Sequence, residues 1–331
     1  MKLKLNNINK SFGKVHVLHD VSFEVDSGRA MGFLGRNGSG KTTSIRCIMD
    51  IFKPDSGDIL LDDQPFKPRE LKVGYLPEER GMYAKEPILE QLIYFGQLRG
   101  GSKAESKKSA EAWLERFELS EYANKKLEVL SKGNQQKIQI IQAFLNDPEM
   151  IILDEPFSGL DPVNAELFKD AIRDAIKANK LVIFSSHQMG YVEEFCDDIT
   201  LIDKGDILIN DSLADVQAEM SQDKYRLEAV NLNREQLKQR LKQIESDHNF
   251  EHDLLAAEDK ISLIINLSNL VPNNFLQKII AAEIQIKNFS VYLPTLTDVF
   301  LHYVKEHDVL TNGIKGQDDE KNRDVSCREE N

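Results

Sequence analysis

Residues 35–42 read Gly-Arg-Asn-Gly-Ser-Gly-Lys-Thr, which matches the phosphate-loop pattern Gly-x4-Gly-Lys-[Ser/Thr]. The apolar run 29–34 ahead of the loop predicts a buried strand, and residues 42–49 predict a helix after it. Glycines let consecutive backbone N–H groups turn toward an anion, and the helix N-terminus adds partial positive charge. A glycine-rich turn before an ordinary helix is the alternative, which the motifs below disfavour. The stretch predicts an α/β fold with a site for nucleotide phosphates.

The side chains at the end of this loop have the chemistry that a bound nucleotide needs. Lys41 would reach the β- and γ-phosphates, and the hydroxyl of Thr42 would coordinate Mg²⁺. We expect the loop and the residue after it to bind the phosphates: Gly35, Arg36, Asn37, Gly38, Ser39, Gly40, Lys41, Thr42 and Thr43.

A second motif, residues 150–155, ends an apolar strand with two carboxylates, Asp154 and Glu155. Ligands of open α/β sheets bind at the carboxyl ends of the strands. Asp154 is therefore predicted to hold Mg²⁺, and Glu155 to orient or deprotonate an attacking water. A buried strand that simply ends in acids at a turn is the alternative.

Between these motifs, residues 130–137 read Leu-Ser-Lys-Gly-Asn-Gln-Gln-Lys and open a predicted helix. The segment resembles the Leu-Ser-Gly-Gly-Gln signature of the ATP-binding-cassette ATPases, with departures at Lys132 and Asn134. In that family the signature closes on the ATP held by the partner subunit. The resemblance implies that Ser131, Gly133 and Asn134 contact a second nucleotide, although an ordinary serine helix cap is the alternative.

Further segments resemble motifs of the same family and occur in the same order along the chain. Residues 158–161 resemble its D-loop, which implies that Asp161 contacts nucleotide, and His187 resembles its switch histidine, at the end of a strand over 181–186. The spacing of Phe12 ahead of Lys41 is similar to that of the adenine-stacking aromatic. A structural histidine and a plain core phenylalanine are the alternatives.

Glu78 stands where the family usually has glutamine, and it can still face Mg²⁺ because the metal offsets its charge. Residues 76–81, read together with residues 130–137, look like a subfamily of exporter-type ATPases associated with sodium extrusion and drug or peptide efflux. We expect residues 79–94, directly after Glu78, to be the main contact with a permease.

The resemblance implies a phosphate-loop NTPase cassette, with a mixed-sheet core and a helical subdomain, followed by a small C-terminal α+β domain. The expected boundaries are 1–222 for the cassette, with its helical subdomain at about 84–146, and 223–305 for the second domain. Residues 306–331 are expected to be a disordered polar tail. Within 223–305 the pattern is strand–helix–strand–strand–helix–strand, which suggests a ferredoxin-like module, with expected strands at 225–230, 253–257, 261–267 and 284–289.

The bulk properties set limits on location and partners. The chain has 331 residues and a net charge of −13, which argues against nucleic acid as a partner. No run approaches the ~18 apolar residues of a membrane helix, and the N-terminus lacks a signal-peptide core. The cysteines Cys47, Cys196 and Cys327 are read as free thiols in a reducing compartment.

The resemblance implies ATP and Mg²⁺ as cofactors. The implied partners are a second copy or a homologous ATP-binding subunit, together with integral membrane permease subunits. The location would be cytoplasmic, peripheral at the inner face of the cell membrane. A soluble regulatory ATPase without a permease and a non-hydrolysing binding module are alternatives. A GTPase is disfavoured because residues 124–127, Asn-Lys-Lys-Leu, fail the Asn-Lys-x-Asp pattern.

Overall fold

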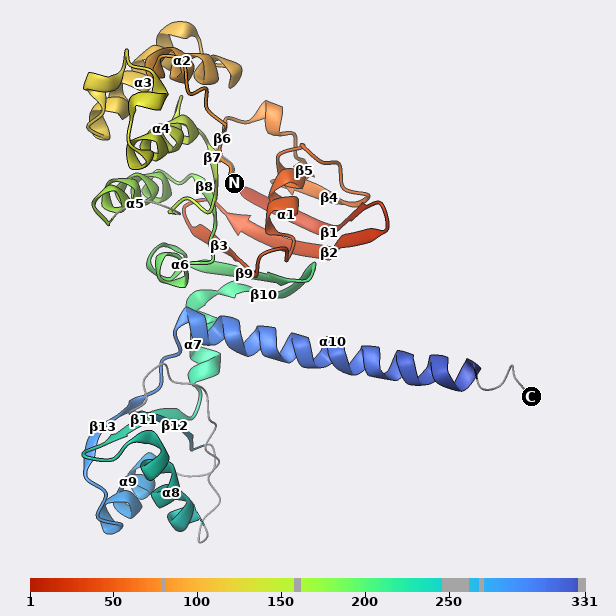
Figure 1. Ribbon diagram of the computed structural model, residues 1–331, viewed down its shortest axis with the longest axis vertical. Coiled ribbons are helices and arrows are strands. Elements are labelled where there is room, and N and C mark those ends of the chain that lie inside the picture. The colour runs from red at the N-terminus through yellow and green to blue at the C-terminus, as the bar shows by residue number, and fades with distance from the viewer. Residues whose placement is uncertain (79–80, 158–161, 246–261, 268–270, 327–331) are drawn as a thin grey trace. The chain divides into compact units, whose positions relative to one another are not determined.

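The structure is a computed structural model that describes residues 1–78, 81–157, 162–245, 262–267 and 271–326 (Figure 1). The chain divides into two compact units, Met1–Ser212 and Leu213–Asn331. The sequence predicts a boundary at 222, but helix α7 (Leu213–Ser221) groups with the second unit. The physical reason is that α7 packs on α10 and β11, which belong to that unit.

A six-stranded sheet in the order β10-β9-β3-β8-β7-β6 forms the centre of the first unit. The strands are β3 (Ala30–Leu34), β6 (Val73–Leu76), β7 (Met150–Asp154), β8 (Leu181–Ser185), β9 (Asp198–Asp203) and β10 (Asp206–Ser212). Only the pairing of β10 with β9 is antiparallel among those described. All residues of β3, β7 and β8 are buried, which explains their nearly continuous apolar runs.

A second, antiparallel sheet has the order β2-β1-β4-β5. Its strands are β1 (Lys2–Phe12), β2 (Val15–Asp26), β4 (Ser56–Leu61) and β5 (Gln64–Pro65). Alternate residues of β1 and β2, among them Leu3, Leu5, Phe23 and Val25, are buried in one core with Phe33 of β3. The period of two gives each strand one apolar and one polar face, so the two sheets share a core.

Helices α1 (Lys41–Ile48), α5 (Pro162–Lys177) and α6 (Met189–Phe195) follow β3, β7 and β8. The helical subdomain contains α2 (Ile88–Leu98), α3 (Lys103–Arg116) and α4 (Lys132–Phe144), which Figure 1 shows grouped at the β6–β7 side of the sheet. Short 3-10 turns occur at Pro68–Glu70, Ser120–Tyr122 and Leu127–Val129. Helix α3 begins with a capping box formed by Ser102 and Glu105.

The second unit contains α7, β11 (Lys224–Ala229), α8 (Arg234–Glu245), β12 (Leu263–Asn266), α9 (Pro272–Ala281), β13 (Ile286–Val291) and α10 (Leu296–Ser326). Its described strands form an antiparallel sheet in the order β12-β11-β13, and Leu237, Leu241, Phe275 and Ile279 pack its helices on the sheet. These elements form the small α+β module expected from the sequence. The strand predicted at 253–257 lies outside the described residues.

Helix α10 continues to Ser326, whereas the sequence predicts a disordered tail from residue 306. The last proline of the chain is Pro294, so no residue interrupts the backbone N–H ladder of this helix. Among the described residues, no helix combines the length and apolar character that crossing a membrane requires.

Candidate nucleotide and active site

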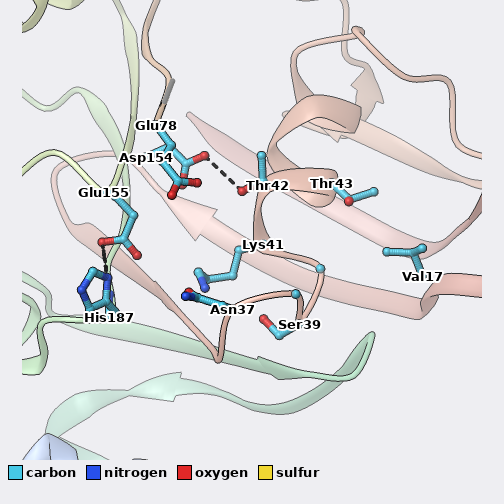
Figure 2. Close-up of a pocket in the computed structure, with 12 residues that line it drawn as sticks. Val17, Asn37, Ser39, Lys41, Thr42, Thr43, Glu78, Asp154, Glu155 and His187 are labelled. Atoms are coloured by element: carbon cyan, nitrogen blue, oxygen red, sulfur yellow. Dashed lines mark hydrogen bonds and ion pairs between the residues drawn. The ribbon is translucent and has the colours of Figure 1, made fainter. Parts of the chain in front are cut away.

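A cavity of about 470 Å³ lies where four neighbouring strands of the parallel sheet end (Figure 2). It is lined by Val17, Asn37, Gly38, Ser39, Gly40, Lys41, Thr42, Thr43, Glu78, Asp154, Glu155 and His187. The loop residues follow β3, Glu78 follows β6, the carboxylates end β7, and His187 follows β8. Since β3, β8, β7 and β6 are adjacent in the sheet, their carboxyl ends bring these distant segments together.

The phosphate loop wraps around the amino group of Lys41. Lys41 Nζ donates to the carbonyl oxygens of Gly35 at 2.8 Å and Arg36 at 3.2 Å. Gly40 takes the N-cap position of α1 without any side-chain cap, so the first N–H groups of the helix are available to a ligand. The loop is thereby arranged to bind an anion.

The hydroxyl of Ser39 gives an independent indication of a ligand. Its Oγ is buried and has no hydrogen-bond partner among the described residues, although Ser39 lines the cavity. A buried hydroxyl without a partner costs free energy, which a phosphate oxygen would recover by accepting its hydrogen bond. The residues present therefore fit a nucleotide phosphate.

Two hydroxyl donors hold the carboxylate of Asp154 in place. Thr42 Oγ1 donates to Asp154 Oδ2 at 3.3 Å, and Ser185 Oγ donates to Asp154 Oδ1. Burial raises the pKa of Asp154, and the bond from Ser185 opposes that rise. The described ranges contain no group of three or more His, Cys, Asp or Glu side chains placed to hold a metal. A single fixed carboxylate such as that of Asp154 fits Mg²⁺, which takes one or two carboxylates and completes its shell with substrate phosphates and water.

Glu155 has a backbone conformation that is unusual for a residue with a side chain, with φ 50°. Its N–H donates to the carbonyl of Ser185 at 3.1 Å, and its Oε2 lies 2.8 Å from Nδ1 of His187. Left-handed conformations of non-glycine residues cost roughly 1–3 kcal/mol and are found most often at functional sites. The carboxylate of Glu155 lines the cavity next to the imidazole (Figure 2).

Negative charge exceeds positive charge on the side chains that line the cavity. Glu78, Asp154 and Glu155 accompany one lysine, Lys41. Burial lowers the pKa of Lys41, while the three carboxylates act to raise it. A polyphosphate would add more negative charge, so its binding here calls for a cation between phosphates and carboxylates.

The predicted signature lies apart from this cavity. Ser131 caps α4 and accepts a hydrogen bond from the N–H of Asn134 at 3.3 Å. Ser131, Gly133 and Asn134 are absent from the cavity lining, and Ser131 is exposed. The structure therefore separates these residues from the phosphate loop of their own chain.

Three other predicted ligands, Gly35, Arg36 and Phe12, are not part of the lining. The guanidinium of Arg36 is paired with Asp203. Phe12 is 44% exposed and packs edge-on against Phe52, with ring centroids 5.1 Å apart. Asp161 lies outside the described residues. Val17 of β2 also lines the cavity. The sequence did not predict this residue, because a lone valine in a strand carries no sequence signal.

This architecture and this loop define an α/β phosphate-loop nucleotide-binding protein. The family model described as ABC transporter matches residues 18–158, and that of the ATP-binding protein DrrA1-3-like C-terminal domain matches residues 212–304. The chain belongs to the ABC transporter ATP-binding proteins, a family of ATPases that drive transport. The predicted family and fold class are thereby confirmed.

Three relatives illustrate the match. The uncharacterized ABC transporter ATP-binding protein YhaQ of Bacillus subtilis is 42% identical over 65% of this chain and 72% of its own. The uncharacterized ABC transporter ATP-binding protein BpOF4_11395 of Alkalihalophilus pseudofirmus is 36% identical over 82% of this chain and 98% of its own. The linearmycin resistance ATP-binding protein LnrL of Bacillus subtilis is 34% identical over 62% of this chain and 68% of its own.

Two solved structures are similar in fold. An ATP-binding subunit of an ABC transporter matches with a TM-score of 0.62 and 27% identity, over 66% of this chain and 93% of that one. The dimeric structure of the bacterial ABC transporter cassette MJ0796 matches with a TM-score of 0.58 and 25% identity, over 64% and 98%.

Proposed function

We propose that two copies of this chain, or one copy and a homologous ATP-binding subunit, close head to tail around MgATP. Closure, and reopening after hydrolysis, would drive integral membrane permease subunits. The proposal rests on one observation. The phosphate loop, Asp154, Glu155 and His187 line the cavity, whereas Ser131 of the same chain lies outside it. An exposed helix N-terminus favours negative charge, so the start of α4 would serve as a second anion site for a nucleotide held by another chain. The solved dimeric cassette supports this arrangement.

We assign the chemical roles to the lining residues. Lys41 and the loop N–H groups would neutralise the phosphates, and Thr42, Asp154 and Glu78 would hold Mg²⁺, which would offset the negative charge of the phosphates. Glu155 would orient the attacking water, and His187 would contact the γ-phosphate.

The residues outside the cavity receive roles that depend on the dimer or on the nucleotide base. Ser131, Gly133, Asn134 and Asp161 would contact the nucleotide at the dimer interface. Phe12 has an exposed ring on which adenine can stack.

Export is the direction that we propose. It is supported by the linearmycin resistance protein LnrL among the relatives and by the DrrA1-3-like domain match. The chain would then act as a cytoplasmic subunit at the inner face of the membrane, held there by the permease.

Mixing two inactive variants tests the head-to-tail site. Ser131→Arg should bind ATP normally but not hydrolyse it, and Lys41→Ala should fail to bind. In a mixture, one composite site combines an intact phosphate loop with an intact signature, so we expect partial recovery of phosphate release. Each variant alone is the control. Loss of ATP binding by Ser131→Arg alone, or a mixture without activity, would contradict the proposal.

A further inference from the structure

The turn that follows β9 is joined to the phosphate loop by an ion pair between a buried carboxylate and a partly exposed guanidinium. Asp203, the last residue of β9, accepts two hydrogen bonds from Arg36, Nε to Oδ1 at 2.8 Å and Nη2 to Oδ2 at 2.7 Å. The side chain of Asp203 is only 2% exposed. A bidentate guanidinium–carboxylate pair fixes orientation as well as distance, because the fork is planar and rigid. The side chain of Arg36 is therefore committed to β9 and not to the cavity.

The backbone of the same turn holds the loop at a second point. The N–H of Gly205 donates to the carbonyl of Ser39 at 2.9 Å, and the carbonyl of Gly205 accepts from the N–H of His19 at 2.9 Å. Gly205 has φ +91°, and a Cβ there would lie 2.5 Å from the carbonyl oxygen of Val17. Only glycine permits this approach, so the turn connects the phosphate loop with β2.

The ion pair is also one peptide away from the functional lysine. Lys41 Nζ donates to the carbonyls of Gly35 and Arg36, the residue whose side chain Asp203 holds. Fixing the Arg36 side chain restricts the peptide whose carbonyl positions Lys41. Asp203 is thus connected to the ammonium group of Lys41 through a single residue, Arg36, whose side chain binds Asp203 and whose carbonyl accepts from Lys41.

We propose that Asp203 is a positioning residue for nucleotide binding, which acts through Arg36 on the phosphate loop and Lys41. The inference rests on the phosphate loop as the nucleotide site and is independent of the dimer and the permease. The loop and Lys41 would hold the phosphates both before and during the reaction. Loss of the pair should then raise the Kd and the KM for ATP more than it lowers kcat.

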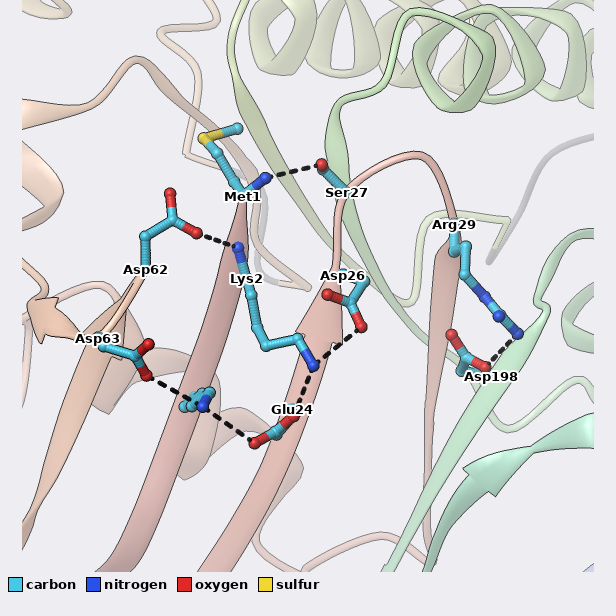
Figure 3. A network of polar contacts seen from close by, with 10 residues as sticks. Met1, Lys2, Glu24, Asp26, Ser27, Arg29, Asp62, Asp63 and Asp198 are labelled. Carbon is cyan, nitrogen blue, oxygen red and sulfur yellow. Dashed lines mark hydrogen bonds and ion pairs between the residues drawn. The ribbon is translucent and has the colours of Figure 1, made fainter.

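The chain offers a matched control at the other end of the same two strands. Arg29, directly before β3, pairs with Asp198, the first residue of β9, at 2.5 Å (Figure 3). Parallel pairing places Met31 opposite Asp198 and Leu34 opposite Leu201, so this pair lies at the amino ends of the strands. It links β3 to β9 without touching the loop.

A double-mutant cycle on the full chain tests the proposal. Asp203→Ala, Arg36→Ala and the double variant are compared with Asp198→Ala, Arg29→Ala and their double variant. Affinity is measured by titration with a fluorescent ATP analogue, kcat and KM by phosphate release, and stability by urea unfolding. We expect about tenfold weaker nucleotide binding for each single variant of the Arg36 pair, the effect typical of residues that orient ligating groups. The double variant should bind no more weakly than the worse single variant, because both remove one interaction. The control variants should bind within about twofold of the unmodified chain.

Arg36→Lys provides a second measurement if Arg36→Ala or Asp203→Ala does not fold. It keeps a positive charge near Asp203 but cannot form the two-bond fork, so its nucleotide affinity should still fall. Unchanged affinity and KM in folded Asp203 and Arg36 variants, with lowered urea midpoints, would show a purely structural ion pair and overturn the proposal. The Lys41→Ala variant distinguishes a failure of the Asp203 proposal from a failure of the proposed nucleotide site. Unaltered ATP binding in Lys41→Ala would refute the phosphate loop itself as that site.

Discussion

The Nδ1 atom of His187 lies 2.8 Å from Oε2 of Glu155, so side chains that follow two different strands form one hydrogen-bonded pair in the nucleotide cavity. The Glu155 side chain is 9% exposed, whereas that of His187 is 56% exposed. The carboxylate is thus shielded from bulk water while the imidazole is accessible to a ligand. This division suits a carboxylate that orients one water and a histidine that contacts a phosphate.

Glu155→Gln should retain ATP binding and lower kcat by at least about 100-fold, because the amide keeps the shape but cannot accept a proton from water. It also removes a negative charge beside the phosphates, so an ATP-bound dimer should accumulate. Gel filtration with ATP and Mg²⁺, together with a phosphate-release assay, measures both effects. Near-normal steady-state hydrolysis would contradict the role of Glu155.

Asp154→Asn should stabilise the nucleotide-free chain at neutral pH while abolishing Mg²⁺-dependent turnover. Burial raises the pKa of Asp154 in the folded state, so the folded chain binds this proton more tightly than the unfolded chain. The resulting stabilisation is full below the ordinary pKa and is lost as the pH rises through the raised pKa. Asparagine carries no buried charge, so the free energy of unfolding of the variant at pH 7 should exceed that of the unmodified chain.

Urea unfolding of both proteins between about pH 4 and pH 8 checks this prediction, since the difference should shrink toward the acidic end. An Asn variant that is less stable than the unmodified chain at pH 7 would show that the hydrogen bonds to Asp154 outweigh its desolvation.

Gly40→Ala should destabilise the chain more than Gly38→Ala, although both glycines lie in the phosphate loop with positive φ. A Cβ at Gly40, where φ is +115°, would lie 2.8 Å from Cδ2 of Leu18, whereas a Cβ at Gly38, where φ is +77°, meets no atom within 4 Å. We expect about 1 kcal/mol for the backbone cost at Gly38 and about 2–3 kcal/mol at Gly40, where crowding adds to it. Urea unfolding without nucleotide measures the free energy of unfolding of both variants. Equal destabilisation would show that contact with Leu18 does not add to the backbone cost at Gly40.

Tyr83→Ala combined with Tyr94→Ala should weaken binding to the permease and leave the ATPase of the free chain within a few-fold. Tyr83 is 56% exposed and Tyr94 49% exposed, and both contact Phe95 at the start of the helical subdomain. The described part of the predicted contact therefore presents an aromatic surface that suits a short helix of a partner. Arg80, within the same predicted contact, lies outside the described residues.

Co-purification with a membrane protein encoded beside this chain measures the effect, and Ile280→Ala is the control. Ile280 is 65% exposed in the second unit, so it matches the tyrosine variants as an exposed apolar truncation. Loss of the permease in Ile280→Ala, with retention in the tyrosine pair, would place the contact on the second unit.

Much of the cavity was predictable because its residues occur in short motifs at strand ends. The phosphate loop, Asp154, Glu155 and His187 each follow a buried apolar run, and parallel strands bring such ends to one edge. The helices and most strands follow from apolar periodicity in the same way. The helical extent of α10 was not predicted, because a polar composition does not distinguish a solvated helix from a disordered tail.

The sequence by itself determined the class of the protein and predicted the groups that would bind a nucleotide, since both inferences depend on residue types at fixed local spacing. Only the tertiary structure decided where their side chains point. Arg36 pairs with Asp203 across a separation of 167 residues, because β3 and β9 are neighbours in the sheet. The exposure of Phe12 and the place of Val17 in the cavity depend likewise on packing between strands. Contacts between distant segments are set by which elements share a core, and local spacing carries no information about that choice.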